Sequence, residues 1–114
     1  MKKNDTILSI EFSPKSIESS SERLLFLAVI LQALLDATKP KAKNESDTSI
    51  FARDRATAWF FAKVGVTCEN FEYVCDNADV NPSYVREFAF KVLKSKEIDY
   101  VRKRINKILD KNKY

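Results

Sequence analysis

Hydrophobic positions recur along most of this chain at the three- to four-residue spacing that gathers side chains on one face of an α-helix. The clearest case is the C-terminal segment KEIDYVRKRINKILDKN, residues 96–112, where basic residues cover all but one apolar stripe. The stripe consists of Ile98, Val101, Ile105, Ile108 and Leu109. Similar patterns in the preceding residues predict an all-α protein of about five helices.

The first long helix is expected from Ser16 or Ser20 to Ala37, with Ser19 or Ser20 as the N-cap. It contains the only long apolar run, LLFLAVILQALL, residues 24–35, which is too short to span a bilayer. The residues before that run carry acidic side chains where a signal peptide would be positively charged. We therefore expect a nearly fully buried helix in a cytoplasmic protein that does not bind membranes.

A second amphipathic helix is expected over residues 49–64, after a polar segment at residues 39–49 that predicts a flexible loop. Its inward positions are expected to be Ile50, Phe51, Ala58, Trp59, Ala62 and part of Phe60 and Phe61. Its outward positions are expected to be Arg53, Asp54, Arg55 and Lys63.

Residues typical of helix starts and ends divide the remaining chain into three further expected helices. Gly65, the only glycine, follows the second helix where a left-handed C′ residue is favoured, and Thr67 is expected to cap a helix over Cys68–Ala78. Asn81-Pro82 is a strong start signal for a helix that runs to about Lys94. Ser95 is expected to cap the basic C-terminal helix over residues 96–112. Residues 1–12 are ambiguous, either an extended arm or a loose lead-in, and residues 13–114 form the single domain.

Composition supports this organisation. One Gly and three Pro leave little turn chemistry for a multi-stranded sheet, and 114 residues suffice to bury a core without metal or disulfides. Cys68 and Cys75 lie seven positions apart in one expected helix, a rise of about 10.5 Å. That separation is beyond what a disulfide tolerates, which predicts two free thiols.

Charge is distributed unevenly along the chain. Residues 86–114 hold ten Lys or Arg against four Asp or Glu, a net +6, whereas residues 1–85 hold ten against twelve, a net −2. A basic C-terminal part points to an anionic partner, most often nucleic acid. A solvated basic tail is the alternative.

In residues 69–91, ENFEYVCDNADVNPSYVREFAFK, the pattern predicts two short helices joined by a very short turn. Two helices that meet steeply over a short turn need small or apolar side chains at the contact and a turn residue that tolerates positive φ. With the turn residue at Asp79, Asp being more tolerant of the left-handed region than most residues, these requirements are met. The contact positions are Val74, Cys75, Ala78, Val80, Val85 and Phe88.

In these residues the chain resembles the helix-turn-helix superfamily of DNA-binding proteins, over residues 68–94, with Asp79 where that family usually has Gly. More faintly, it is similar to small uncharacterised bacterial and phage helical proteins. The resemblance implies that residues 82–94 are the recognition helix and that double-stranded DNA is the partner. Base edges would then be read by Asn81, Ser83 and Arg86, with phosphates bound by Lys91, Lys94, Arg102, Lys103, Arg104 and Lys107. Such proteins usually act as homodimers, which the apolar run at residues 24–35 also suggests.

An acidic stripe on the preceding helix favours a different partner. Glu69, Glu72, Asp76 and Asp79 follow helical spacing, and carboxylates in that place would repel phosphates. The alternative function is therefore a non-catalytic helical adaptor that binds a protein through this stripe or through an apolar helix face. A solvated acidic face is the simplest interpretation of the stripe.

We expect no enzyme activity, cofactor or metal. The chain contains no His, the commonest general base and metal ligand, and one Gly cannot form a glycine-rich phosphate loop. The function expected from the sequence is that of a small transcription-regulator-like DNA-binding protein, linked to phages or mobile elements by analogy alone.

Overall fold

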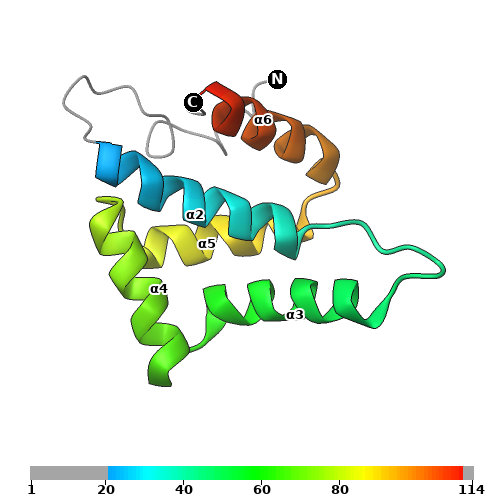
Figure 1. Ribbon diagram of the computed structural model, residues 1–114, viewed down its shortest axis with the longest axis horizontal. Coiled ribbons are helices and arrows are strands. Elements are labelled where there is room, and N and C mark those ends of the chain that lie inside the picture. The colour runs from blue at the N-terminus through cyan, green and yellow to red at the C-terminus, as the bar shows by residue number, and fades with distance from the viewer. Residues whose placement is uncertain (1–20, 112–114) are drawn as a thin grey trace.

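The computed structural model describes residues 21–111, and this part of the chain is all α-helical (Figure 1). Five helices form one domain, and no strand occurs between residues 21 and 111, which confirms the predicted fold class. Their bounds are Ser21–Ala37 (α2), Asp47–Phe61 (α3), Gly65–Asn77 (α4), Pro82–Lys94 (α5) and Ile98–Lys111 (α6). The expected N-terminal arm, the start of the first helix and residue 112 lie outside the described residues.

The helices α2 and α5 join α6 to the rest of the domain, because each of them contacts α3, α4 and α6. The helix α4 crosses the ends of α2 and α3 steeply, and α6 lies on the opposite side of α2 from α3 (Figure 1). This arrangement places the sharp α4–α5 corner at one end of the domain.

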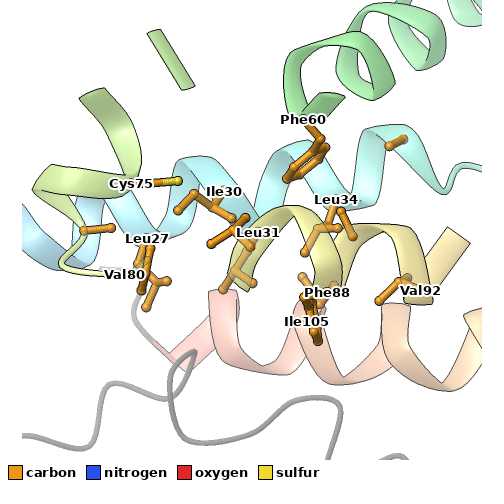
Figure 2. Close-up of a cluster of buried hydrophobic side chains, with 14 of the residues drawn as sticks. Leu27, Ile30, Leu31, Leu34, Phe60, Cys75, Val80, Phe88, Val92 and Ile105 are labelled. Carbon is orange, nitrogen blue, oxygen red and sulfur yellow. The ribbon is translucent and has the colours of Figure 1, made fainter. Parts of the chain in front are cut away.

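The apolar helix α2 supplies the largest share of the core. Leu27, Ile30, Leu31 and Leu34 are at most 2 % exposed, and Figure 2 shows them on the side of α2 that faces the other helices. The expectation of a nearly fully buried helix is wrong at two positions, because Leu25 is 65 % and Val29 is 42 % exposed. The described helices include none with the length and hydropathy needed to cross a membrane.

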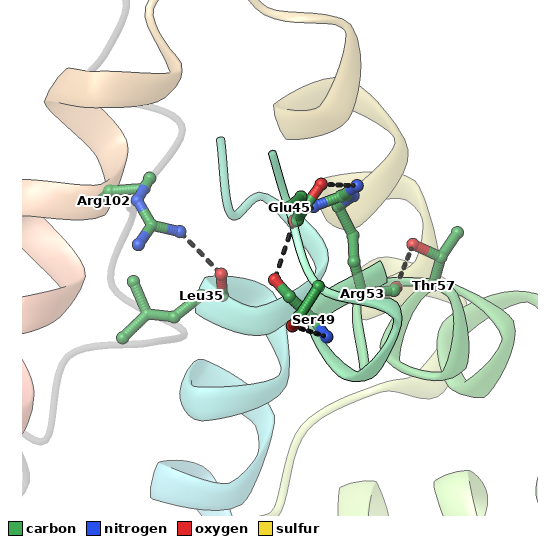
Figure 3. A network of polar contacts seen from close by, with 7 residues as sticks. Leu35, Glu45, Ser49, Arg53, Thr57 and Arg102 are labelled. Carbon is green, nitrogen blue, oxygen red and sulfur yellow. Dashed lines mark hydrogen bonds and ion pairs between the residues drawn. The ribbon is translucent and has the colours of Figure 1, made fainter. Parts of the chain in front are cut away.

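The helix α3 begins two residues earlier than predicted because its start is held by polar side chains (Figure 3). Ser46 caps it by accepting a hydrogen bond from the Ser49 amide at 3.1 Å. Glu45 accepts two hydrogen bonds from the Arg53 guanidinium and one from the Ser49 hydroxyl. These bonds, chiefly those from Arg53, lower the pKa of Glu45 to about 2. The Arg53 side chain is only 11 % exposed, so the prediction that it faces water is wrong.

The inward face of α3 also differs from the prediction. Phe60 is its one buried residue, with Trp59 half-buried beside it, whereas Ile50 and Phe51 are 39 % and 61 % exposed and Ala58 is exposed as well. The helix is apolar on several sides, so its periodicity does not select one face. Only contact with α2 and α4 settles which side chains are buried.

The turn between α3 and α4 corrects two further predictions. Gly65 does have a positive φ, +91°, but it is the first residue of α4 rather than the C′ residue of α3, which ends with Ala62 as its C-cap. Because α4 starts at Gly65, Thr67 lies inside its first turn and does not cap it. The N-cap position is Val64, which offers no side-chain hydrogen bond.

The core joins all five helices, and Phe60 and Phe71 are its largest fully buried side chains. Trp59 packs edge-on against both rings, at centroid distances of 5.2 Å and 5.0 Å, and its indole N–H donates to Asn70 Oδ1 at 2.8 Å. Both cysteines are buried free thiols, and burial raises the pKa of Cys75 to about 12.

Candidate nucleic-acid interface

The corner between α4 and α5 has its turn residue at the predicted position. Asp79 has φ +61° and is the only non-glycine residue with positive φ among residues 21–111. The Val80 amide donates to Cys75 O at 3.0 Å, and the Asp79 amide donates to Asp76 O at 3.1 Å. This pair of bonds, with a left-handed residue between them, is the Schellman termination of a helix. The chain therefore leaves α4 abruptly while the Cys75 and Asp76 carbonyls keep hydrogen-bond donors.

The apolar contact positions predicted for this corner are all buried. Their exposed fractions are at most 8 %, for Val74, Cys75, Ala78, Val80, Val85 and Phe88. The next helix begins as predicted, with Pro82 at its first position and Asn81 as the N-cap, whose Oδ1 accepts from the Ser83 and Tyr84 amides at 2.8 and 3.2 Å. The predicted turn residue, contact positions and helix start are therefore confirmed.

The helix α5 keeps one side free of core contacts. Val85, Phe88, Ala89 and Val92 form its buried face. On the opposite side, an exposed stripe comprises Ser83, Glu87, Phe90, Lys91 and Lys94. The Lys94 ammonium lies 5.0 Å from the centre of the Phe90 ring, which is 53 % exposed. We call these five residues the outer stripe of α5.

Arg86 is absent from this stripe, so its placement conflicts with its predicted role in reading base edges. Its Nε donates to the Phe60 carbonyl at 2.9 Å, and one terminal nitrogen donates to the Ala62 carbonyl at 3.3 Å. The guanidinium also lies 4.6 Å from the centre of the Phe71 ring and 3.5 Å from Cys68 Sγ. Carbonyls at a helix C-terminus lack intrahelical donors, and Arg86 satisfies two at the end of α3.

Arg102 makes an equivalent contact on the other side of the domain, so its predicted phosphate role also conflicts with its placement. One terminal nitrogen donates to the Leu35 carbonyl at 2.6 Å (Figure 3). The same nitrogen donates to the Thr38 hydroxyl at 2.9 Å. It thereby caps the C-terminus of α2, which has no basic residue of its own in its last turn. Arg104 is half-buried and donates to the Tyr100 hydroxyl at 3.0 Å.

Four lysines among the predicted phosphate-binding residues are exposed: Lys91, Lys94, Lys103 and Lys107. Lys103 and Lys107 lie on the side of α6 opposite its buried residues, Val101 and Ile105, since positions four apart share a face. Among the predicted base-reading residues, Ser83 is exposed on the outer stripe, whereas the side-chain oxygen of Asn81 is already used in capping.

The predicted acidic stripe is present in part. Glu69, Glu72 and Asp76 are exposed on α4, whereas the fourth residue, Asp79, is exposed in the turn after the end of that helix. Asp79 Oδ2 lies 3.9 Å from Arg23 Nε. Tyr73, on α4, is 59 % exposed. The stripe thus presents carboxylates and one aromatic ring to solvent on the helix that precedes the corner.

Sequence reasoning missed one surface feature, an apolar groove between α2 and α6 with a volume of about 660 Å³. Leu25 was expected to be buried with the rest of its helix and Leu109 was assigned to the apolar stripe of residues 96–112, so nothing in the pattern revealed a gap between the two helices. Comparison with protein-family models, curated proteins and solved structures gave no match.

Proposed function

We propose that this protein binds double-stranded DNA, as a small regulator-like protein, through the outer stripe of α5 and the exposed lysines of α6. The observation that supports this most is the α4–α5 corner. It combines a left-handed Asp79, a Schellman termination and a helix start at Asn81-Pro82, and it leaves one whole side of α5 outside the core. A helix presented in this way can enter a major groove.

Contacts with the phosphate backbone dominate the proposed interaction. Lys91, Lys94, Lys103 and Lys107 are exposed, and none of them forms an ion pair within residues 21–111, so they can release counterions from DNA. Arg86 and Arg102 contribute to the fold instead, because their guanidinium groups are held by backbone carbonyls. Because Arg86 is bound within the fold, few side chains of the outer stripe can read bases. Modest discrimination between DNA sequences is therefore expected.

The test is a fluorescence-anisotropy titration of a labelled mixed-sequence duplex at two salt concentrations. Lys103→Ala with Lys107→Ala should weaken binding and flatten the dependence of log K on log salt by about one unit per lost contact. The matched control is Lys41→Ala with Lys43→Ala, which removes the same charge from exposed residues of the loop between α2 and α3. Equal losses in both pairs, or no binding by the parent protein at low salt, would contradict the proposal.

A second candidate function, a protein-binding adaptor, is favoured by the exposed acidic stripe of α4. Carboxylates beside the exposed Tyr73 suit a cationic protein segment better than a nucleic acid. Glu72→Gln with Asp76→Asn separates the two functions, because the pair lowers the local negative charge without touching the core. A DNA-binding protein keeps or gains duplex affinity with these changes, whereas an adaptor loses affinity for a Lys-rich peptide probe.

A further inference from the structure

The outer stripe of α5 carries one large apolar side chain, Phe90. Its ring is 53 % exposed, whereas Phe88, on the buried face of the same helix, is 4 % exposed. Within residues 21–111 the Phe90 ring stacks on no other aromatic ring, and the Lys94 ammonium lies 5.0 Å from its centre. An exposed phenylalanine forgoes the stabilisation that burial gives, so packing within the domain does not account for Phe90.

Phe90 lies on the side of α5 that would enter the major groove in the proposed complex. An α-helix with its side chains is about 10–12 Å across, which matches a major groove about 12 Å wide. Lys91 and Lys94 are exposed beside the ring, and their charge draws the phosphate backbone toward this part of the helix. An uncharged ring between two such lysines is left to face the base edges.

We propose that Phe90 reads thymine by packing against the methyl group that this base presents in the major groove, an inference that rests on the proposed DNA binding. A phenyl ring has no hydrogen-bond donor or acceptor, so it cannot recognise the polar pattern of a base edge. Thymine is the DNA base that places a methyl group in the major groove, and phenylalanine is among the side chains that contact it. The chemistry of the ring therefore favours an A·T pair at its position over a G·C pair.

Glu87, one turn before Phe90, is the only carboxylate on the outer stripe. A carboxylate can accept a hydrogen bond from the amino group of cytosine, but it has no apolar surface to offer a methyl group. Its negative charge opposes phosphates in every sequence alike. Preference for thymine and overall affinity therefore have separate sources on α5, and different substitutions separate them.

The experiment compares two labelled duplexes of alternating adenine and thymine, one of which has deoxyuridine in place of every thymine. Deoxyuridine keeps the charge and the base pairing and lacks only the methyl group. Fluorescence anisotropy should show that the full chain binds the thymine duplex about three- to fivefold more tightly, as expected for one buried methyl group. Phe90→Ser should abolish this preference and leave the salt dependence unchanged, because the lysines remain. Phe90→Leu, which keeps an apolar side chain, should retain part of the preference.

Two controls accompany these variants. Phe51→Ser removes a phenylalanine of similar exposure, 61 %, from α3 and should leave the thymine preference at the parent value. Glu87→Gln should raise the affinity for both duplexes by the same factor. Circular dichroism checks that each variant keeps its helices.

The outcomes distinguish this inference from the proposed function. Equal affinity of the parent protein for the two duplexes would overturn the thymine contact while DNA binding stands. The same conclusion follows if Phe90→Ser weakens binding to both duplexes equally, because the ring would then serve only to position Lys94. Absence of binding to either duplex at low salt would overturn the proposed function and this inference with it.

Discussion

Replacement of Arg86 tests whether this residue supports the fold or reads DNA. In Arg86→Ala the carbonyls of Phe60 and Ala62 lose their charged donor, and the Phe71 ring loses the guanidinium 4.6 Å from its centre. A hydrogen bond from a charged group contributes about 1.5–3 kcal/mol, and a cation–π contact about 0.5–2 kcal/mol. Because Arg86 is only partly buried and water can replace part of its contacts, we expect a loss of about 2–4 kcal/mol.

Urea unfolding followed by circular dichroism measures this loss, and the same samples serve for duplex binding. Arg86→Lys should recover only part of the stability, because an ammonium cannot match the planar fork of a guanidinium. Lys94→Ala, on the outer stripe of the same helix, is the control and should change stability by less than about 0.5 kcal/mol while weakening DNA binding. The reasoning fails if Arg86→Ala leaves stability unchanged but selectively lowers affinity for a preferred duplex.

Three other substitutions test the packing and the polar contacts. Phe60→Ala should lower the free energy of unfolding by about 3–5 kcal/mol, because the Phe60 ring is fully buried. Phe51 is 61 % exposed, so Phe51→Ala should change this free energy by less than about 0.5 kcal/mol in the same urea assay. Asp79→Gly should stabilise the protein by up to about 1 kcal/mol, since glycine adopts φ +61° without the Cβ clash, and a lower thermal midpoint would contradict this. The pKa of Glu45 is lowered from 4.5 to about 2 in the folded protein, so its contribution to stability is complete above pH 4.5 and is lost as pH falls toward 2. The free energy of unfolding should therefore fall less steeply between pH 4.5 and 2 in Glu45→Gln than in the parent protein. An unchanged pH dependence would show that the Glu45–Arg53 contact does not cause the loss of stability in acid.

Local interactions explain which features the sequence predicted well. The Asn81 cap, the Pro82 start and the left-handed Asp79 depend on interactions within a few residues of the chain. They can therefore be predicted from the local sequence. The stripes of α5 and α6 were equally predictable, because each has one continuous apolar face against a polar remainder. These signals were enough to predict the all-α class and the shape of the corner.

Contacts between distant helices decided the rest. Arg86 and Arg102 belong to polar positions in their own helices, and no local pattern shows that carbonyls at the ends of α3 and α2 lie within their reach. The apolar character of α3 on several sides left its buried face undetermined until α2 and α4 packed against it. The sequence by itself therefore determined the helices and the corner between α4 and α5. Tertiary structure alone decided which cations remain free for a partner, because a long side chain binds whichever unsatisfied helix end the fold brings near.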